Sequence, residues 1–234
     1  MICVVCKEPD NHPVNSPSHR FPFLRKKRVL LFAVVAAALI FGAFHYDSTF
    51  RSWMLSEQSP HWKHTPEHAA SVALSKYGDW IPLMGITAVA ALIARGFGNR
   101  KWTKIFVTAI VASALAGILA TSCRSLTGRT RPIATPPITP GWYGPYHNGR
   151  CLIGVHAYNS FPSGHTATAV GLAAVILFSQ PLWGIPCMLV ALAIAASRLY
   201  LGQHNLSDVT AALFLGLAVG WGTWRIAKRK GNIF

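Results

Sequence analysis

Six long apolar runs divide the sequence. They extend from Val29 to Tyr46, Trp80 to Ala94, Ile105 to Cys123, Thr166 to Ser179, Leu182 to Ser197, and Val209 to Ile226. A helix needs about 20 apolar residues to cross a bilayer core of about 30 Å, and several runs approach that length. The pattern therefore predicts an all-α fold, an integral-membrane bundle of six transmembrane helices whose ends are defined to within a few residues.

The composition agrees with a membrane protein and excludes several other classes. Of the 234 residues, 52% are hydrophobic and 12% are charged, whereas soluble domains carry about a quarter charged residues. A net charge of +15 would by itself suggest a nucleic-acid partner, but the apolar runs argue against that interpretation. An ordinary soluble enzyme, a disordered chain and a disulfide-dense secreted scaffold are excluded as well.

The positions of the basic residues predict the orientation in the membrane. Most Lys and Arg lie before the first run, between the second and third runs, and after the last. Such residues are retained on the cytoplasmic side, so we expect both termini in the cytoplasm. The chain then divides into an N-terminal tail (1–28), a six-helix domain (29–226) and a basic tail (227–234). A cleaved signal peptide over 25–44 is the alternative, but no small-x-small cleavage site follows it.

The segment from Asp47 to Asp79 carries mixed charge and is expected to form a connector along the outer membrane surface. Its histidines His61, His64 and His68 would share one face of a helix, which raises a metal site as an alternative. Prolines interrupt the segment, so a solvated interfacial stretch is the preferred interpretation.

The cysteines give weaker signals. Cys3 and Cys6 have the spacing of a zinc site, but no second cysteine pair accompanies them in the tail, so zinc binding is not predicted. Cys123 and Cys151 both fall on the proposed outer side, where a disulfide could persist, and the sequence leaves that bridge open.

The first candidate for chemistry is a histidine and carboxylate pair. Asp208 is the one acidic residue after Asp79, and it follows His204 by four positions. A helical turn would place both side chains on one face, and a carboxylate beside an imidazole fixes its tautomer and stabilises its cation. The alternative is that Asp208 only caps the last helix, and the pair alone does not decide between the two.

A second histidine, His165, follows a helix-start pattern directly before the fourth run. Ser163 can cap that helix, and Gly164 lets backbone N–H groups approach an anion at the positive helix end. The alternative is a plain helix start with an interfacial histidine.

Three arginines on the same outer side complete the set, namely Arg124, Arg131 and Arg198. Guanidinium groups suit phosphate because they stay charged and bind two oxygens at once. Any one of them could merely contact lipid headgroups, but their convergence with both histidines and the carboxylate favours chemistry. A single acid cannot assemble a carboxylate-rich two-metal site. The sequence therefore predicts metal-independent phosphoryl transfer, with no metal and no cofactor.

These residues resemble the three signatures of the type-2 phosphatidic acid phosphatases, a family grouped with the vanadium haloperoxidases. The family patterns are Lys-x6-Arg-Pro, Pro-Ser-Gly-His and Ser-Arg-x5-His-x3-Asp. The chain has Arg124-x6-Arg131-Pro132, Pro162-Ser163-Gly164-His165 and Ser197-Arg198-x5-His204-x3-Asp208. Arg124 stands where the family has Lys, which keeps the charge but replaces a compact ammonium by a planar fork.

The resemblance implies a role for each of these residues. His204 would attack phosphorus to give a phosphohistidine, Asp208 would hold its ring, and His165 would protonate the leaving oxygen and then activate water. The phosphate oxygens would be bound by Arg124, Arg131, Arg198, Ser163 and the Gly164 N–H.

The family also implies a phosphorylated membrane lipid as the substrate, which would reach a site on the outer face with its tail still in the bilayer. The compact size of the chain suggests a bacterial inner membrane as the location. Phosphatidic acid, phosphatidylglycerophosphate, polyprenyl diphosphate and lipid A phosphates all occur as substrates in the family, and the motifs do not choose among them. The alternatives are a lipid phosphotransferase using the same phosphohistidine, a transporter, and a lipid-binding protein without catalysis.

Overall fold

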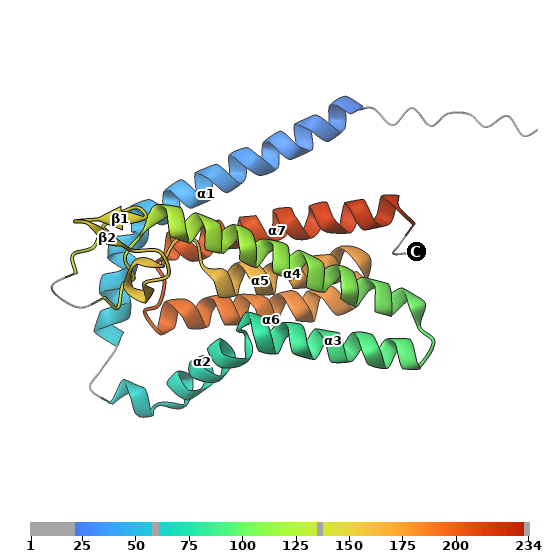
Figure 1. The fold of residues 1–234 in the computed structure, drawn as a ribbon, viewed down its shortest axis with the longest axis horizontal. Coiled ribbons are helices and arrows are strands. Elements are labelled where there is room, and N and C mark those ends of the chain that lie inside the picture. The colour runs from blue at the N-terminus through green and yellow to red at the C-terminus, as the bar shows by residue number, and fades with distance from the viewer. Residues whose placement is uncertain (1–21, 58–60, 135–137, 232–234) are drawn as a thin grey trace, which may run out of the picture. The chain divides into compact units, whose positions relative to one another are not determined.

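The computed structural model describes residues 22–57, 61–134 and 138–231. The long helices are α1 (Pro22–Glu57), α3 (Trp80–Gly96), α4 (Arg100–Thr127), α5 (Gly164–Ser179), α6 (Pro181–Tyr200) and α7 (Leu206–Arg229) (Figure 1). The shorter elements are η1 (Trp62–His64), α2 (Pro66–Tyr77), β1 (Tyr146–His147), β2 (Arg150–Cys151) and η2 (His156–Tyr158). Each of the six apolar runs lies inside one long helix, so the mostly helical architecture is confirmed. The Cys3 and Cys6 pattern lies outside the described residues.

Four of the described helices are long and apolar enough to cross a membrane, which makes the chain an integral membrane protein. They are α1 over Val29–Met54, α4, α6 and α7. A fifth span is obtained if α2 and α3, which meet at an angle of 66°, are counted together. Helix α5 has 16 residues and is shorter than a bilayer core requires. The count of six spans therefore stays a prediction.

The chain divides into two parts within α1, after Val35. In the first part, the described residues form the start of α1, and every side chain from Val29 to Val35 is exposed. Exposed apolar side chains on all faces are typical of a helix surrounded by lipid. The second part contains the rest of α1 and every other element.

Helix α5 is the centre of the second part. Of its 16 residues, 13 are buried, and α4, α6 and α7 all pack against it. Small residues allow the close approach, as in other membrane bundles. A Cβ at Gly220 of α7 would lie 2.6 Å from the Cβ of Ala174, and Ala112 and Ala116 of α4 are fully buried. The packing fixes the start of α5 relative to three neighbouring helices.

The segment expected to be a connector is largely helical. Helix α1 continues past the predicted end at Tyr46 to Glu57, so Asp47 lies in a helix and its side chain is 12% exposed. This corrects the expectation that Asp47 begins a solvated stretch, because a buried partner described below holds it. Among the described residues, no group of three His, Cys, Asp or Glu side chains could hold a metal ion.

The segment between α4 and α5 contains two short strands, which the all-α prediction did not include. β1 and β2 pair antiparallel, with Tyr146 opposite Cys151. The turn residues Asn148 and Gly149 have φ of 49° and 74°, as a two-residue hairpin turn requires. Cys151 and Cys123 are both free thiols, so the disulfide that the sequence left open is not formed in this structure.

Candidate active site

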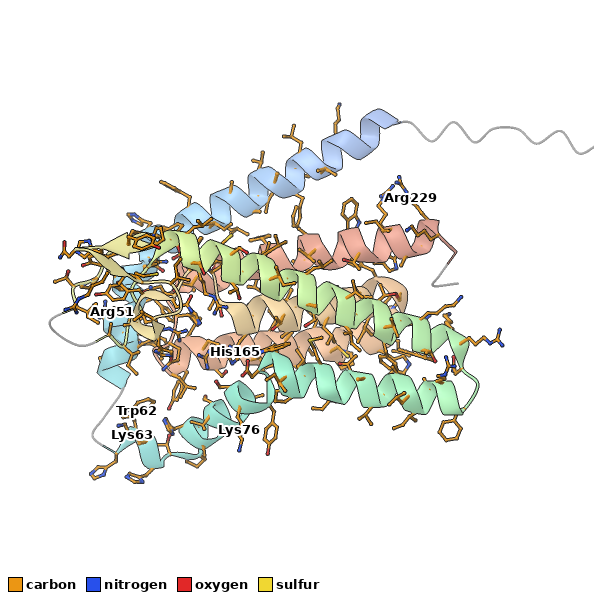
Figure 2. All side chains as sticks on the ribbon, viewed as in Figure 1. Arg51, Trp62, Lys63, Lys76, His165 and Arg229 are labelled. Atoms are coloured by element: carbon orange, nitrogen blue, oxygen red, sulfur yellow. The ribbon has the colours of Figure 1, made fainter. Side chains whose placement is uncertain are left out.

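The predicted site residues lie at one end of the bundle, where α4 and α6 end and α5 and α7 begin (Figure 1). The Ser163 N–H donates to the main-chain oxygen of Asp208 at 3.1 Å, which ties the start of α5 to the start of α7. Figure 2 shows Arg229 at the opposite end of the helices from His165. Two helix N-termini thus direct their positive ends toward the same place, which favours an anion there.

His204 lies in the turn between α6 and α7 and is 3% exposed. Its Nδ1 is 2.9 Å from the main-chain oxygen of Ser160 and 3.7 Å from Oδ2 of Asp208. Both neighbours are acceptors, so Nδ1 carries the ring hydrogen and Nε2 keeps its lone pair. The expected pairing of His204 with Asp208 is close, but the hydrogen-bond partner of the ring is Ser160.

Asp208 is fully buried and has several donors. Its Oδ2 accepts from the Ser160 hydroxyl at 2.6 Å and from the Asn205 N–H at 2.7 Å. Its Oδ1 accepts from Nη1 of Arg129 at 2.5 Å. The bond from Asn205 forms the capping box at the start of α7, so Asp208 does cap the helix. Its action on His204 stays a prediction, and the structure places the two side chains 3.7 Å apart.

Burial controls the protonation of His204. Loss of hydration lowers the pKa of His204 to about 4, although the neighbouring carboxylate of Asp208 acts in the opposite direction. Burial disfavours the cationic ring more than this one carboxylate favours it. The imidazole is therefore neutral near pH 7, the state in which Nε2 can act as a nucleophile.

The guanidinium group of Arg124 lies directly over Gly164. A Cβ at Gly164 would be 3.0 Å from both Nη atoms of Arg124, closer than ordinary van der Waals contact. Nη2 of Arg124 also donates to the Thr121 hydroxyl at 2.7 Å. The glycine lets the guanidinium lie close to the first turn of α5, and a Cβ there would displace it by a few tenths of an ångström.

Arg131 and Arg198 join Arg124 in one cluster. Burial, together with the positive charges of Arg198 and Arg124, lowers the pKa of Arg131 to about 10. Arg131 donates to Oε1 of Gln203 at 2.8 Å and to the main-chain oxygen of Asn159 at 3.1 Å. The Nε atoms of all three arginines are buried without a hydrogen-bond partner in the described structure. Three convergent cations with donors to spare are what a multiply charged anion requires.

His165 faces a carboxylate that the sequence analysis did not assign to the site. Nε2 of His165 is 3.6 Å from Oδ1 of Asp79, and Figure 2 shows His165 beside the junction of α2 and α3 (Figure 2). Asp79 caps α3 by accepting from the Trp80 N–H. Ser75 of α2 accepts a hydrogen bond from Arg198. The junction of α2 and α3 therefore borders the arginine and histidine cluster.

Ser163 corrects one expectation. It occupies the N-cap position of α5, but its side chain makes no capping hydrogen bond. Its hydroxyl oxygen instead accepts from the Thr166 hydroxyl at 3.0 Å, because both side chains are completely buried and need polar partners.

Sequence reasoning missed Arg129, Asp47 and Ser160. Arg129 is buried and bridges Asp47 and Asp208, and Ser160 holds both Asp208 and His204. Arg129 lies within the first motif, two positions before Arg131. This position could have drawn attention to it but does not predict its partners. Asp47 is an acid placed inside an apolar helix, and such groups usually mark function.

Comparison with known families and proteins gives a consistent result. The model of the PAP2 superfamily matches residues 84–232. A lipid A 1-phosphatase of Porphyromonas gingivalis is 30% identical over 148 residues, 60% of this chain and 27% of the relative. The undecaprenyl-diphosphatase BcrC of Bacillus subtilis is 32% identical over 75 residues, 32% of this chain and 39% of the relative. The chain thus spans well under half the length of these relatives.

Two crystal structures share the fold. The first is a transmembrane PAP2-type phosphatidylglycerolphosphate phosphatase from Bacillus subtilis, with a TM-score of 0.56, 18% identity, and coverage of 86% of this chain and 94% of the other. The second is LpxE of Aquifex aeolicus, with a TM-score of 0.51, 20% identity, and coverage of 76% and 93%. At these identities the likeness supports the fold alone.

Proposed function

The chain belongs to the PAP2 superfamily, and from this membership we propose that it is an integral-membrane, metal-independent lipid phosphate or diphosphate phosphatase. The observation that carries the proposal is the convergence of a neutral, hydrogen-bonded imidazole at His204 with three clustered arginines and His165. A buried neutral imidazole beside cations that bind phosphate is suited to in-line attack on phosphorus.

The reaction begins at Nε2 of His204. Its lone pair forms a bond to phosphorus while the bond from phosphorus to the lipid oxygen breaks, and His165 gives that oxygen a proton. A water molecule then attacks the phosphohistidine and transfers a proton to His165. The bond from phosphorus to nitrogen breaks, its electron pair returns to Nε2, and inorganic phosphate leaves. Hydrogen bonding of Nδ1 to Ser160 keeps the ring oriented through both steps.

The arginines and helix ends stabilise the charge. Arg124, Arg131 and Arg198 bind the phosphate oxygens, and Ser163 and the Gly164 N–H add donors at the start of α5. Their unpartnered Nε atoms and the repulsion among them favour a bound dianion. Such groups already lie in place before negative charge develops in the transition state.

Metal independence is supported by the chemistry of the acids. Among the described residues, three acids lie near the site. The oxygens of Asp208 already accept from Arg129, Ser160 and Asn205, Asp47 is paired with Arg129, and Asp79 caps α3 and lies beside His165. A two-metal phosphatase needs several carboxylates free to bind cations. Charge stabilisation by arginine takes that place in the proposed reaction.

The site belongs to the outer, periplasmic face of a bacterial inner membrane. The basic turn between α3 and α4 and the basic end of α7, including Arg229, lie at the end of the bundle opposite His165. Basic residues mark the cytoplasmic side, which supports a site on the other face and a cytoplasmic end of α7. The cytoplasmic N-terminus rests on the basic residues of the sequence alone. A lipid phosphate could reach the site with its chains still in the bilayer.

The experiment is release of inorganic phosphate by detergent-purified protein, with EDTA present, over a panel of lipid mono- and diphosphates. The variants are His204→Ala and His165→Ala, and exposed His61→Ala is the matched control. We expect release that survives EDTA, persists in the control and is lost in His204→Ala. Release unchanged in His204→Ala would contradict the assigned nucleophile. Transfer of phosphate between lipids, without release, would favour the phosphotransferase.

A further inference from the structure

Arg129 lies in a buried charge cluster that the proposed reaction does not yet use. Its Nη1 donates to Oδ1 of Asp208 at 2.5 Å and to the Ser207 hydroxyl at 2.6 Å. Its Nη2 donates to Oδ2 of Asp47 at 2.6 Å. One guanidinium group therefore bridges a carboxylate of α1 and a carboxylate of α7.

Aromatic rings enclose the guanidinium group. Its Cζ lies 5.1 Å from the ring centroid of Phe44, 4.7 Å from that of Trp142 and 6.0 Å from that of Phe161. Arg129 is 9% exposed. In such surroundings charge interactions are stronger than in water, and breaking one partner leaves a buried charge uncompensated.

One face of α1 supplies the contacts to this region. Phe44, Asp47 and Arg51 are spaced three and four residues apart, so they share a side of the helix. Arg51 donates to the main-chain oxygen of Pro132 at 2.8 Å. Asp47 also accepts from the Ser207 N–H at 2.9 Å, which is an orphan donor in the first turn of α7. Asp47 therefore holds both Arg129 and the start of α7.

We propose that Asp47 and Arg129 are positioning residues for catalysis, which fix Asp208 and, through Ser160, the ring of His204. This inference rests on the proposed function. The Ser160 hydroxyl donates to Asp208, and its main-chain oxygen accepts from Nδ1 of His204. The Ser160 N–H donates to the main-chain oxygen of Arg129 at 3.1 Å. A shift of Arg129 is therefore transmitted to both members of the catalytic pair.

The charges of the cluster have a further effect. Asp47 and Asp208 together carry one more negative charge than Arg129 balances, and His204 gains positive charge when Nε2 bonds to phosphorus. Negative charge nearby stabilises that form of the ring in a low-dielectric site. Asp47 therefore stabilises the transition state more than it stabilises bound phosphate. The bound phosphate is held by Arg124, Arg131 and Arg198.

The test compares two anions on the purified full chain. Orthovanadate adopts five-coordinate geometry with a bond to a nucleophile and so resembles the transition state, whereas inorganic phosphate stays four-coordinate. The variants are Asp47→Asn, which removes the charge and keeps the shape, and Arg129→Lys. The matched controls are Glu67→Gln and Arg95→Lys, both at exposed positions.

We expect Asp47→Asn and Arg129→Lys to weaken vanadate binding by roughly tenfold or more, the size expected for a charged hydrogen bond. Phosphate binding should change by less than about threefold and kcat should fall more than KM rises. The controls should behave like the wild type. If Asp47 and Arg129 had only a structural role, the variants would have a lower folded fraction and would bind both anions more weakly to the same extent. That result would overturn the inference.

If Asp47→Asn fails to fold, Ser207→Ala serves instead, because it removes the hydroxyl that accepts from Arg129 and donates to Asp47 and keeps both charged carboxylates. Vanadate binding equal to that of the wild type in all three variants would also overturn the inference. If the wild type is active and the variants bind vanadate as it does, the inference is contradicted and the proposed function is not. A wild type that neither releases phosphate nor binds vanadate contradicts the proposed function and the inference with it.

Discussion

Nδ1 of His204 donates its hydrogen to the main-chain oxygen of Ser160 at 2.9 Å, while the carboxylate of Asp208 stands 3.7 Å away. A main-chain acceptor cannot be removed by mutation, whereas the Ser160 hydroxyl, which holds Asp208, can. The two functions of Ser160 are therefore separable, and the separation gives a first prediction.

Ser160→Ala should reduce activity without removing the nucleophile. The ring keeps its main-chain acceptor, but Asp208 loses a buried hydrogen bond worth about 1–3 kcal/mol. We expect kcat to fall by roughly tenfold and phosphohistidine still to form. Ser122→Ala on the exposed face of α4 is the control and should have wild-type rates. Complete loss of phosphoenzyme in a folded Ser160→Ala protein would contradict this arrangement.

Gly164→Ala should weaken binding of the phosphate group. The added Cβ would lie 3.0 Å from both Nη atoms of Arg124, so the guanidinium must move away from the start of α5. Loss of one charged contact predicts a rise in KM of roughly tenfold, measured by steady-state phosphate release. Gly222→Ala, where a Cβ meets nothing within 4 Å, should leave KM unchanged. An unchanged KM in Gly164→Ala would show that Arg124 does not bind the substrate.

The burial of His204 predicts a loss of stability in acid. Its pKa falls to about 4 in the folded chain, below the ordinary value of about 6.5. As the pH falls, the unfolded chain therefore takes up the proton before the folded chain does. The free energy of unfolding falls by roughly 3 kcal/mol for this group between pH 6.5 and about pH 4. Thermal unfolding of the wild type and His204→Gln between these values isolates the contribution. A parallel pH dependence of both proteins would contradict it.

The pH profile of kcat should be bell-shaped, with limbs set by the two histidines in the complex with substrate. In the free protein, burial lowers the pKa of both His165 and His204 to about 4, so the profile of kcat/KM would not separate the two limbs. His204 must be neutral and His165 must carry a proton at the first step. Asp79→Asn should move the alkaline limb to lower pH, because it removes a negative charge 3.6 Å from Nε2 of His165. Glu67→Gln should leave both limbs in place. An alkaline limb that does not move in Asp79→Asn would show that this carboxylate does not act on the general acid.

The sequence by itself determined the helical fold and most of the predicted site. Apolar runs need little context, since a long uncharged segment satisfies its backbone only as a helix in lipid. The three motifs predicted the candidate site residues because their chemistry and spacing are local, and the structure brings these residues to one end of the bundle. For Gly164 the sequence predicted a backbone approach to an anion, which stays a prediction. It did not identify the guanidinium of Arg124 as the group above this glycine.

Only the tertiary structure decided which groups hold the catalytic pair. Asp47 and Arg129 are 82 residues apart, and Ser160 lies 48 residues from Asp208. No local pattern links residues at such separations, because the helix packing around α5 sets their contacts. The same packing leaves Asp47, which was expected to be solvated, with a side chain only 12% exposed. Spacing along the chain predicts which residues react, whereas packing decides which groups hold them.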